Sequence, residues 1–160
     1  MSPTASSPLT IRRMRLEDVP RVHEIDTLSF SLPWPERSFT FEATENPASR
    51  PWVAEKDGRL VAMLVLWLVV DEAHIATIAT HPDYRRQGIG EAILIQALLA
   101  ARAEGARRAF LEVREGNHAA QTMYRKYGFE VTGKRPKYYQ DNGENALLMS
   151  LENLNAMEDQ

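Results

Sequence analysis

The sequence predicts an α/β fold in which the sheet is mixed, as in α+β proteins. Its central twisted sheet has about seven strands and is flanked by about four helices. Two observations lead to this prediction. In the first half, Asp57-Gly58 separates two apolar runs, which is the pattern of a β-hairpin. In the second half, strand-like and helix-like segments alternate, which favours parallel pairing. We therefore expect a sheet with both antiparallel and parallel neighbours and with helices on both faces.

The first half of the chain contains four expected strands and two expected helices. Apolar residues recur at every third position from Val19 to Leu28, as on one helix face, and Pro20 is tolerated in the first turn. The residues 32–35, Leu-Pro-Trp-Pro, break this helix, and Pro47 follows the end of a second one. The expected elements are strand 9–14, helices 18–28 and 36–44, and strands 52–55, 60–70 and 72–80.

The second half alternates between the two kinds of element. An apolar helical pattern is followed by Gly105, a typical residue just beyond a helix end. A shorter helical pattern begins at Asn117, a good N-cap, and is followed by Gly128. The expected elements are helices 88–103 and 117–127 and strands 108–114, 129–134 and 146–151.

Length and composition limit the class of protein. The chain has 160 residues, is 44% hydrophobic and 26% charged, and carries a net charge of −3. These values predict one globular domain over residues 9–152, with loose tails at 1–8 and 153–160. The charge gives no broad basic field, so we expect no direct nucleic-acid partner. The chain contains no cysteine, which excludes disulfides and a thiol nucleophile on the protein.

The location and assembly of the protein are expected from weaker signals. The apolar run 60–70 is about half as long as the roughly 20 residues of a membrane span, so no membrane partner is expected. Residues 1–8 lack the features of a signal peptide. We expect a cytoplasmic protein that is a monomer or a weak dimer.

A candidate anion site lies at the start of the helix 88–103. Gly88 and Gly90 allow close approach of a ligand to the backbone, and the first N–H groups of the helix have no internal partner. Arg85 and Arg86 add positive charge. The dinucleotide-binding pattern fails because Ile93 occupies its third glycine position, and no Gly-Lys-Ser/Thr follows. From these residues alone, a phosphate site and a plain tight turn are equally good interpretations.

The pattern Arg85-x-x-Gly88-x-Gly90 after residues 78–82 resembles the pyrophosphate motif of the GNAT superfamily of N-acetyltransferases. Further segments resemble one branch, the bacterial ribosomal-protein-alanine N-acetyltransferases, which modify the α-amino group of protein N-termini. They cover most of residues 9–151 and include residues 30–34, 111–114, Asn117, Tyr124, 128–129, 138–139 and 144–149.

The resemblance implies the GNAT fold and acetyl-CoA as cosubstrate. In this fold two neighbouring parallel strands, here 72–80 and 108–114, splay apart around the pantetheine arm. The implied cofactor residues are the backbone of Ile78, Ala79 and Thr80 for pantetheine, the run Arg85, Arg86, Gln87, Gly88, Ile89, Gly90 and Glu91 for pyrophosphate, and Asn117.

The resemblance also implies two catalytic side chains. Glu112 matches the general base that takes a proton from the amine, and Tyr124 is the candidate acid for the departing thiolate. Read without the resemblance, Glu112 is a surface carboxylate paired with Arg114 or another cation, and Tyr124 is a core aromatic. A backbone N–H of Ala79 or Thr80 would polarise the carbonyl. Because the chain has no cysteine, we expect the amine to attack acetyl-CoA directly in a ternary complex. The four histidines lack a metal-ligand spacing, so no metal is expected.

The acceptor is expected to be a peptide, the N-terminus of a ribosomal protein with alanine or a similar first residue. Phe30, Pro33 and Tyr138 are the candidate substrate-binding residues. The chain departs from the branch at Thr80, Gly116, Pro35 and Asn145, positions where other residues are usual. Two other functions remain open, acetylation of a small amine or a lysine side chain, and non-catalytic binding of acyl-CoA.

Overall fold

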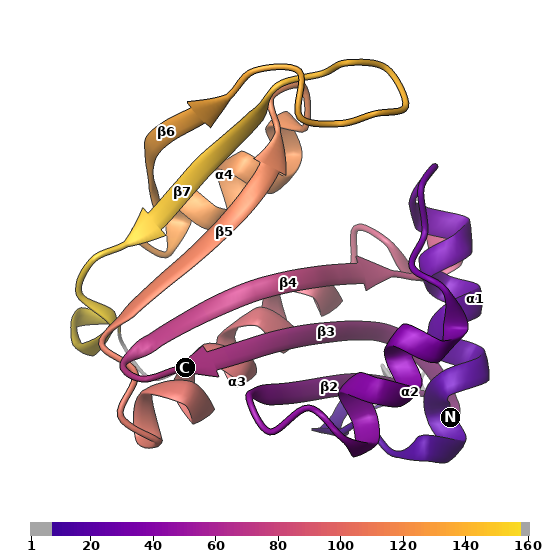
Figure 1. Cartoon of the computed structure of the whole chain (residues 1–160). Coiled ribbons are helices and arrows are strands. Elements are labelled where there is room, and N and C mark those ends of the chain that lie inside the picture. Colours follow the sequence, from indigo (N-terminus) through magenta and orange to yellow (C-terminus); the bar gives the residue numbers. More distant parts are fainter. Residues whose placement is uncertain (1–7, 158–160) are drawn as a thin grey trace. The chain divides into compact units, whose positions relative to one another are not determined.

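The computed structural model describes residues 8–157 and contains seven strands and four α-helices within that range (Figure 1). The strands are β1 (Thr10–Arg13), β2 (Ser49–Lys56), β3 (Arg59–Val69), β4 (Glu72–Thr80), β5 (Arg108–Arg114), β6 (Glu130–Arg135) and β7 (Ala146–Leu151). The helices are α1 (Val19–Ser29), α2 (Glu36–Thr44), α3 (Ile89–Ala103) and α4 (His118–Lys126). Short 3-10 helices are η1 (Leu16–Asp18), η2 (Pro82–Tyr84) and η3 (Leu154–Ala156).

The strands form one mixed sheet in the order β1-β2-β3-β4-β5-β7-β6. The pairs β1–β2, β5–β7 and β6–β7 are antiparallel, whereas β4 and β5 are parallel. The parallel register joins the first four residues of each strand, Glu72–Ile75 with Arg108–Leu111. The predicted mixed sheet of seven strands with four helices is therefore confirmed, including the predicted parallel pair.

The chain divides into two compact units that are described separately. The first unit comprises the described residues up to Val65 together with Thr77–Leu94, and the second comprises Leu66–Ala76 together with the described residues from Ile95 onward. The strands β3 and β4 and the helix α3 each contribute to both units. A single domain over residues 9–152 stays a prediction.

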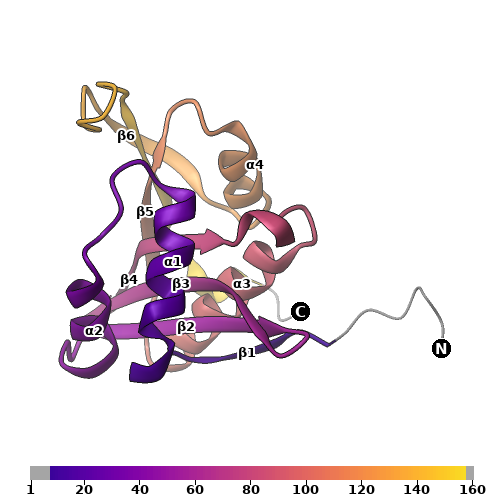
Figure 2. The same cartoon turned by 90° about the vertical axis from the view of Figure 1, so that its right-hand side faces the viewer.

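The first unit contains the predicted hairpin and two packed helices. Asp57 and Gly58 have φ angles of 56° and 73°, the left-handed pair that a tight hairpin turn requires. Helix α1 packs on α2, which packs on β2 (Figure 2). The prediction that Leu28 belongs to the buried face of α1 is wrong, because its side chain is 51% exposed. A strict three-residue repeat drifts around a helix of 3.6 residues per turn, so Leu28 lies opposite Val19.

The second unit places α4 against β5, β7 and β6 (Figure 1). The Oδ1 atom of Asn117 accepts a hydrogen bond from the N–H of Ala120 at 3.2 Å, so the predicted N-cap is confirmed. Gly128 follows the helix with a φ of 100°, a left-handed value that favours glycine. Along β5, Leu111 and Val113 are buried while Glu112 is exposed, which is the alternation of a strand with one covered face.

The end of the described chain is ordered where composition suggests a loose tail. Leu154 in η3 is fully buried, Met157 is 8% exposed, and the backbone carbonyl of Met157 accepts a hydrogen bond from Arg102 at 2.6 Å. The expected tail from residue 153 is therefore wrong as far as residue 157, because two apolar side chains anchor an otherwise polar segment. The remaining tail residues, 1–7 and 158–160, lie outside the described residues. None of the helices between residues 8 and 157 has the length and apolarity of a membrane span.

Candidate active site

The loop 85–88 and the start of α3 form the candidate anion site of the first unit. Arg86 and Gly88 both have left-handed backbone angles, with φ of 65° and 77°. The carbonyl of Gly88 accepts the first helical hydrogen bond, from Ala92 at 3.0 Å. Left-handed residues in such a turn direct backbone N–H groups into a concavity, and the helix dipole adds partial positive charge. This geometry suits a phosphate group.

The two glycines contribute to this loop in different ways. A Cβ atom added at Gly88 would meet no atom of the described residues within 4 Å, so glycine is needed there for its φ angle. A Cβ atom at Gly90 would lie 3.4 Å from the Oγ1 atom of Thr80. Thr80, one of the residues at which the chain departs from the branch, therefore packs its hydroxyl against the start of α3. The surface above Gly88 stays open for a ligand.

The side chains around the loop have distinct partners. Arg85 donates from Nε to the carbonyl of Thr80 at 3.0 Å and from Nη2 to the Oγ atom of Ser29 at 3.2 Å. Lys56 donates from Nζ to the Oε1 atom of Gln87 at 2.8 Å. Lys56 is a cation that sequence reasoning missed, because only the hairpin brings it to this loop. Arg85 holds the loop in place, and Lys56 adds positive charge beside it.

The remaining predicted cofactor residues of the first unit lie on both sides of this loop. Ile78 is half-buried near the end of β4, and Ala79 is 7% exposed. Ile89 is buried at the start of α3, and Glu91 is partly exposed in its first turn. Their backbone groups, rather than their side chains, are the predicted contacts with the cofactor.

The candidate acceptor segment of the first unit follows α1. Phe30 is 39% exposed and Pro33 is exposed, so both side chains are accessible as predicted. The Trp34 ring stacks on Phe39, with 5.2 Å between ring centroids. The backbone N–H of Trp34 donates to the Oδ2 atom of Asp26 at 2.7 Å. The end of the segment is thus fixed, while its apolar side chains face solvent.

In the second unit, Glu112 occupies the exposed face of β5. Its Oε2 atom lies 3.7 Å from Nε of Arg135, and it accepts a hydrogen bond from the hydroxyl of Tyr138. Arg114 turns instead to Asp141 at 2.8 Å and Glu144 at 3.3 Å. The interpretation of Glu112 as a surface carboxylate paired with Arg114 or another cation therefore fits the structure, and the cation is Arg135 rather than Arg114.

Tyr124, the predicted proton donor, is a core aromatic in the structure. It is 5% exposed and its ring lies 5.8 Å from that of Phe129. Burial raises the pKa of Tyr124 to about 12, and the neighbouring Tyr139 adds to this rise. The phenol therefore keeps its proton at neutral pH, as an acid for a departing thiolate must.

Tyr139 is electrostatically coupled to both proposed catalytic groups. Burial raises its pKa to about 12, the charge of Arg114 opposes this shift, and the carboxylate of Glu112 reinforces it. The Arg114 guanidinium lies 3.9 Å from the centroid of the Tyr139 ring, and the Tyr138 ring packs against Tyr139 at 5.1 Å. The sequence predicts that Tyr139, like Tyr138, packs over the backbone of an incoming peptide. In the structure Tyr139 lies against Arg114 and Tyr138, and its packing on a peptide stays a prediction.

The loop between β6 and β7 is held by polar contacts that involve two departures from the branch, Gly116 and Asn145. Glu144 accepts a hydrogen bond from the N–H of Gly116 at 2.7 Å, and a Cβ atom at Gly116 would lie 2.8 Å from the same carboxylate oxygen. Asn145 accepts from the N–H of Lys137 at 3.0 Å and donates to Glu115 at 3.2 Å, which an aspartate cannot do. These contacts fix the turn that carries Tyr138 and Tyr139.

The start of α4 is tied to the end of β5. The buried Gln121 donates from Nε2 to the carbonyls of Arg114 at 3.1 Å and Glu115 at 2.8 Å. Asn117 uses its Oδ1 atom for the helix cap, which leaves its amide group as the part suited to the predicted cofactor contact. Gln121 carried no signal in the sequence, since polar helix residues are usually exposed.

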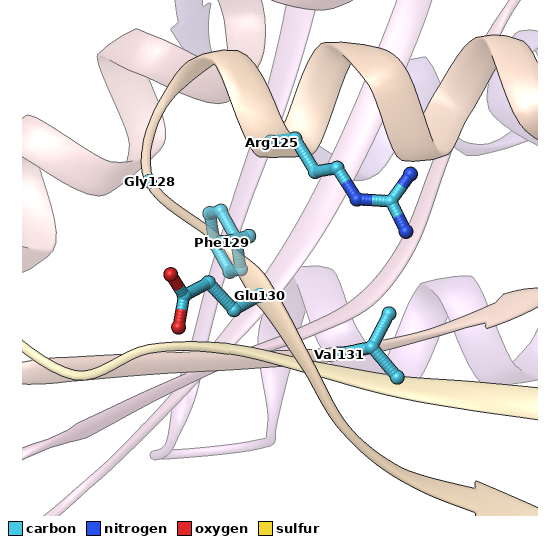
Figure 3. A pocket seen from close by; sticks show the side chains of 5 residues that line it. All are labelled: Arg125, Gly128, Phe129, Glu130 and Val131. Carbon is cyan, nitrogen blue, oxygen red and sulfur yellow. The ribbon is translucent and has the colours of Figure 1, made fainter.

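A surface pocket of the second unit lies away from these residues. It has a volume of about 330 Å³ and is lined by Arg125, Gly128, Phe129, Glu130 and Val131, where α4 turns into β6 (Figure 3). None of the predicted site residues lines it. Within residues 8–157, no group of three or more histidine, aspartate or glutamate side chains is arranged to hold a metal. The absence of a metal requirement stays a prediction.

Comparisons with known proteins identify the family. The model of the acetyltransferase (GNAT) family matches residues 19–129. A Bacillus subtilis (strain 168) protein, the putative [ribosomal protein bS18]-alanine N-acetyltransferase, is 46% identical over 139 residues, covering 87% of this chain and 92% of its own. The [ribosomal protein bS18]-alanine N-acetyltransferase of Escherichia coli (strain K12) is 32% identical over 144 residues, covering 89% and 96%.

Solved structures agree with the sequence relatives. The crystal structure of the ribosomal-protein-S18-alanine N-acetyltransferase from Escherichia coli matches with a TM-score of 0.84 and 31% identity, covering 90% of this chain and 93% of that one. Ard1 from Thermoplasma volcanium matches with a TM-score of 0.80 and 30% identity, covering 89% and 95%. With the phosphate-type loop, the mixed sheet and these matches, the chain belongs to the GNAT family of acetyltransferases.

Proposed function

We propose that this chain transfers the acetyl group of acetyl-CoA to the α-amino group of the N-terminal alanine of ribosomal protein bS18. The observation that carries the proposal is the 46% identity, over 87% of this chain, to the putative [ribosomal protein bS18]-alanine N-acetyltransferase of Bacillus subtilis. The exposed carboxylate of Glu112 and the buried phenol of Tyr124 are the base and the acid that we assign to this reaction.

The first unit supplies the groups for acetyl-CoA. The N–H groups from Arg86 to Glu91 bind the pyrophosphate, and Lys56 adds charge beside Gln87. The backbone at Ile78–Thr80 binds the pantetheine arm, and an N–H of Ala79 or Thr80 polarises the acetyl carbonyl. Left-handed φ angles at Arg86 and Gly88 support the phosphate assignment.

The second unit supplies the proton transfers. An α-amino group has a pKa of about 7.7–8.0, so its proton is lost at little cost near neutral pH, and Glu112 accepts it directly or through water. The free amine attacks the thioester carbonyl carbon, a C–N bond forms and the C–S bond breaks. Tyr124 donates its proton to the departing sulfur. The amine proton held by Glu112 passes to solvent, and the second proton lost by the attacking nitrogen restores the Tyr124 phenol through solvent. The products are N-acetylated protein, CoA and one proton.

A peptide acceptor is favoured by accessible apolar side chains in both units. Phe30 and Pro33 project from the segment after α1, and Tyr138 is 44% exposed on the turn after β6. We propose that Phe30 and Pro33 of the first unit, and Tyr138 of the second, are each available to contact an acceptor peptide. A small polyamine would need acidic groups rather than exposed aromatic and proline side chains.

An acceptor screen tests the proposal. The purified protein is mixed with acetyl-CoA and release of free CoA is followed. The acceptors are peptides with the bS18 N-terminus beginning with free alanine, the same peptides blocked at the N-terminus but containing lysine, and small polyamines. We expect release with the free N-terminus alone.

The other outcomes of the screen have definite meanings. Release with blocked lysine peptides or polyamines would contradict the proposed acceptor while leaving acetyl transfer intact. Binding of acetyl-CoA without release on any acceptor would contradict catalysis and favour an acyl-CoA-binding module.

A further inference from the structure

Asp26, near the end of α1, is a buried carboxyl that the acetyl-transfer chemistry does not use. It is 1% exposed. Its Oδ2 atom accepts a hydrogen bond from the N–H of Trp34 at 2.7 Å, and its backbone carbonyl accepts one from the N–H of Phe30 at 3.0 Å. The side chain of Asp26 therefore fixes the Trp34 end of the acceptor segment, residues 30–34, while its backbone carbonyl accepts the ordinary hydrogen bond at the end of α1.

The sequence of this segment explains why a carboxylate is used. Pro33 and Pro35 have no backbone N–H, so Trp34 supplies the single backbone donor of the Pro33-Trp34-Pro35 tripeptide. A buried donor without an acceptor is costly, and a hydrogen bond to a carboxylate is stronger than one to a neutral oxygen. Asp26 thus accepts the hydrogen bond from the only backbone N–H of this rigid tripeptide.

Keeping the carboxyl of Asp26 buried costs free energy, because the charged form is removed from water. Burial raises the pKa of Asp26, against the opposing effects of the Trp34 N–H and the nearby His23. His23 itself lies 3.8 Å from Glu36. A buried carboxyl is retained where its hydrogen bond fixes a conformation that apolar packing alone would leave free.

By holding Trp34, Asp26 fixes the conformation of residues 30–34, which carry the accessible side chains. The Trp34 ring is anchored on the fully buried Phe39, whereas Phe30 and Leu32 are 39% and 55% exposed. One end of the segment is therefore fixed, and its apolar side chains are exposed to solvent. An apolar contact surface gains affinity when it is ordered before binding, because less conformational entropy is lost on association.

We propose that Asp26 is a positioning residue for the acceptor, which holds residues 30–34 in the shape that presents Phe30 and Pro33 to the incoming peptide. This inference rests on the proposed function, since it assigns the segment to acceptor binding. Asp26 is 1% exposed and acts through the backbone of Trp34.

Three variants test this role, Asp26→Ala, Asp26→Asn and Asp18→Ala. Asparagine keeps an oxygen that can accept from the Trp34 N–H, and alanine does not. Asp18 is the matched control, since it is 7% exposed and accepts a backbone N–H from Arg15 at 2.7 Å, but its side-chain partner is Arg12. KM and kcat for the bS18 N-terminal peptide, KM for acetyl-CoA, and Tm are measured for each.

The expected result is a selective change in acceptor KM. Asp26→Ala should raise KM for the peptide about tenfold, the size expected for a lost hydrogen bond to a charged group, with kcat and KM for acetyl-CoA nearly unchanged. Asp26→Asn should restore most of the loss. Asp18→Ala should lower Tm without changing KM for the peptide.

Two results would overturn the proposal. One is a folded Asp26→Ala protein with an unchanged KM for the peptide. The other is a rise in KM for the peptide in Asp18→Ala that equals the rise in Asp26→Ala. If Asp26→Ala does not fold, Asp26→Ser replaces it, because its shorter side chain places the hydroxyl too far from the Trp34 N–H, and the same criteria apply. Failure of the proposed function is separate, because it appears as absence of peptide turnover by the unsubstituted protein.

Discussion

The two units achieve their proposed tasks with different parts of the chain. The loop 85–90 of the first unit relies on backbone N–H groups, placed by left-handed residues and the start of α3. The second unit relies on side chains, the exposed carboxylate of Glu112 and the buried phenol of Tyr124. A site made of backbone depends on conformation and tolerates many side chains, whereas a site made of side chains depends on single atoms.

This difference predicts how each unit responds to substitution. Removing one oxygen or one hydroxyl in the second unit should abolish a proton transfer while the fold stays intact. In the first unit, loss of function should come from residues that distort the backbone, and should appear as weaker acetyl-CoA binding. The following substitutions test this contrast, from the largest expected effect to the smallest.

The Glu112→Gln substitution should have the largest effect. It removes the proposed base but keeps the shape of the side chain on the exposed face of β5. We expect kcat to fall by about 10²–10⁴-fold, the usual contribution of a general base, with an unchanged Kd for acetyl-CoA. Glu130→Gln, an exposed carboxylate on β6, serves as control and should leave both values unchanged. A parallel loss of cofactor affinity in Glu112→Gln would mean that Glu112 is structural.

The Tyr124→Phe substitution should come next. It keeps the ring against Phe129 but removes the proton, so kcat should fall by roughly 10²-fold while Tm changes little. Tyr127→Phe, at the end of the same helix, is the matched control. Because the pKa of Tyr124 is raised to about 12, the unsubstituted enzyme should show no loss of kcat from this group up to about pH 10. A falling limb below pH 10 that disappears in Tyr124→Phe would contradict the assigned pKa.

The Gly88→Ala substitution tests the backbone site. A non-glycine residue at a φ of 77° costs about 1–2 kcal/mol, so acetyl-CoA binding should weaken by about tenfold, measured by calorimetry. Gly58→Ala carries a similar strain at a φ of 73° in the hairpin turn and should lower Tm without weakening binding. Equal affinities in the two variants would remove the phosphate assignment of the loop.

The smallest effect concerns the pH dependence of stability at Asp26. Its pKa in the folded protein is raised above the usual value of 3.8, so the folded state binds this proton more tightly than the unfolded state. The stability that this proton contributes is present below pH 3.8 and is lost as pH rises through the folded pKa. The free energy of unfolding of the unsubstituted protein should therefore fall relative to Asp26→Asn as pH rises from 3.8. A difference that is constant with pH, followed by urea unfolding, would contradict the raised pKa.

Local features of the fold were predictable from the sequence because they depend on neighbouring residues. The hairpin at Asp57-Gly58, the Asn117 cap and the bounds of α2, β4, β5 and β7 follow from turn chemistry and hydrophobic period. The exposure of Leu28 was not predicted, because a three-residue repeat drifts around a helix of 3.6 residues per turn. The order at residues 153–157 was missed because its two apolar anchors stand among polar residues.

The site was predictable only where it has a sequence motif. Gly88 and Gly90 mark the backbone loop, and the family resemblance singles out Glu112 and Tyr124. Lys56 leaves no such mark, because a tertiary contact brings it to Gln87. Asp26 is intermediate, since a Pro-Trp-Pro turn with one free N–H implies an acceptor nearby but does not say which residue provides it.

The most direct test of the central claim is the position of the acetyl group on the product. Purified ribosomal protein bS18 with a free N-terminal alanine is incubated with the enzyme and acetyl-CoA, and the product is sequenced by tandem mass spectrometry. We predict a single acetyl group on the α-amino nitrogen of that alanine. This group should be absent when the Glu112→Gln variant is used in place of the unsubstituted enzyme. An acetyl group on lysine side chains, with the N-terminal amine still free, would contradict it.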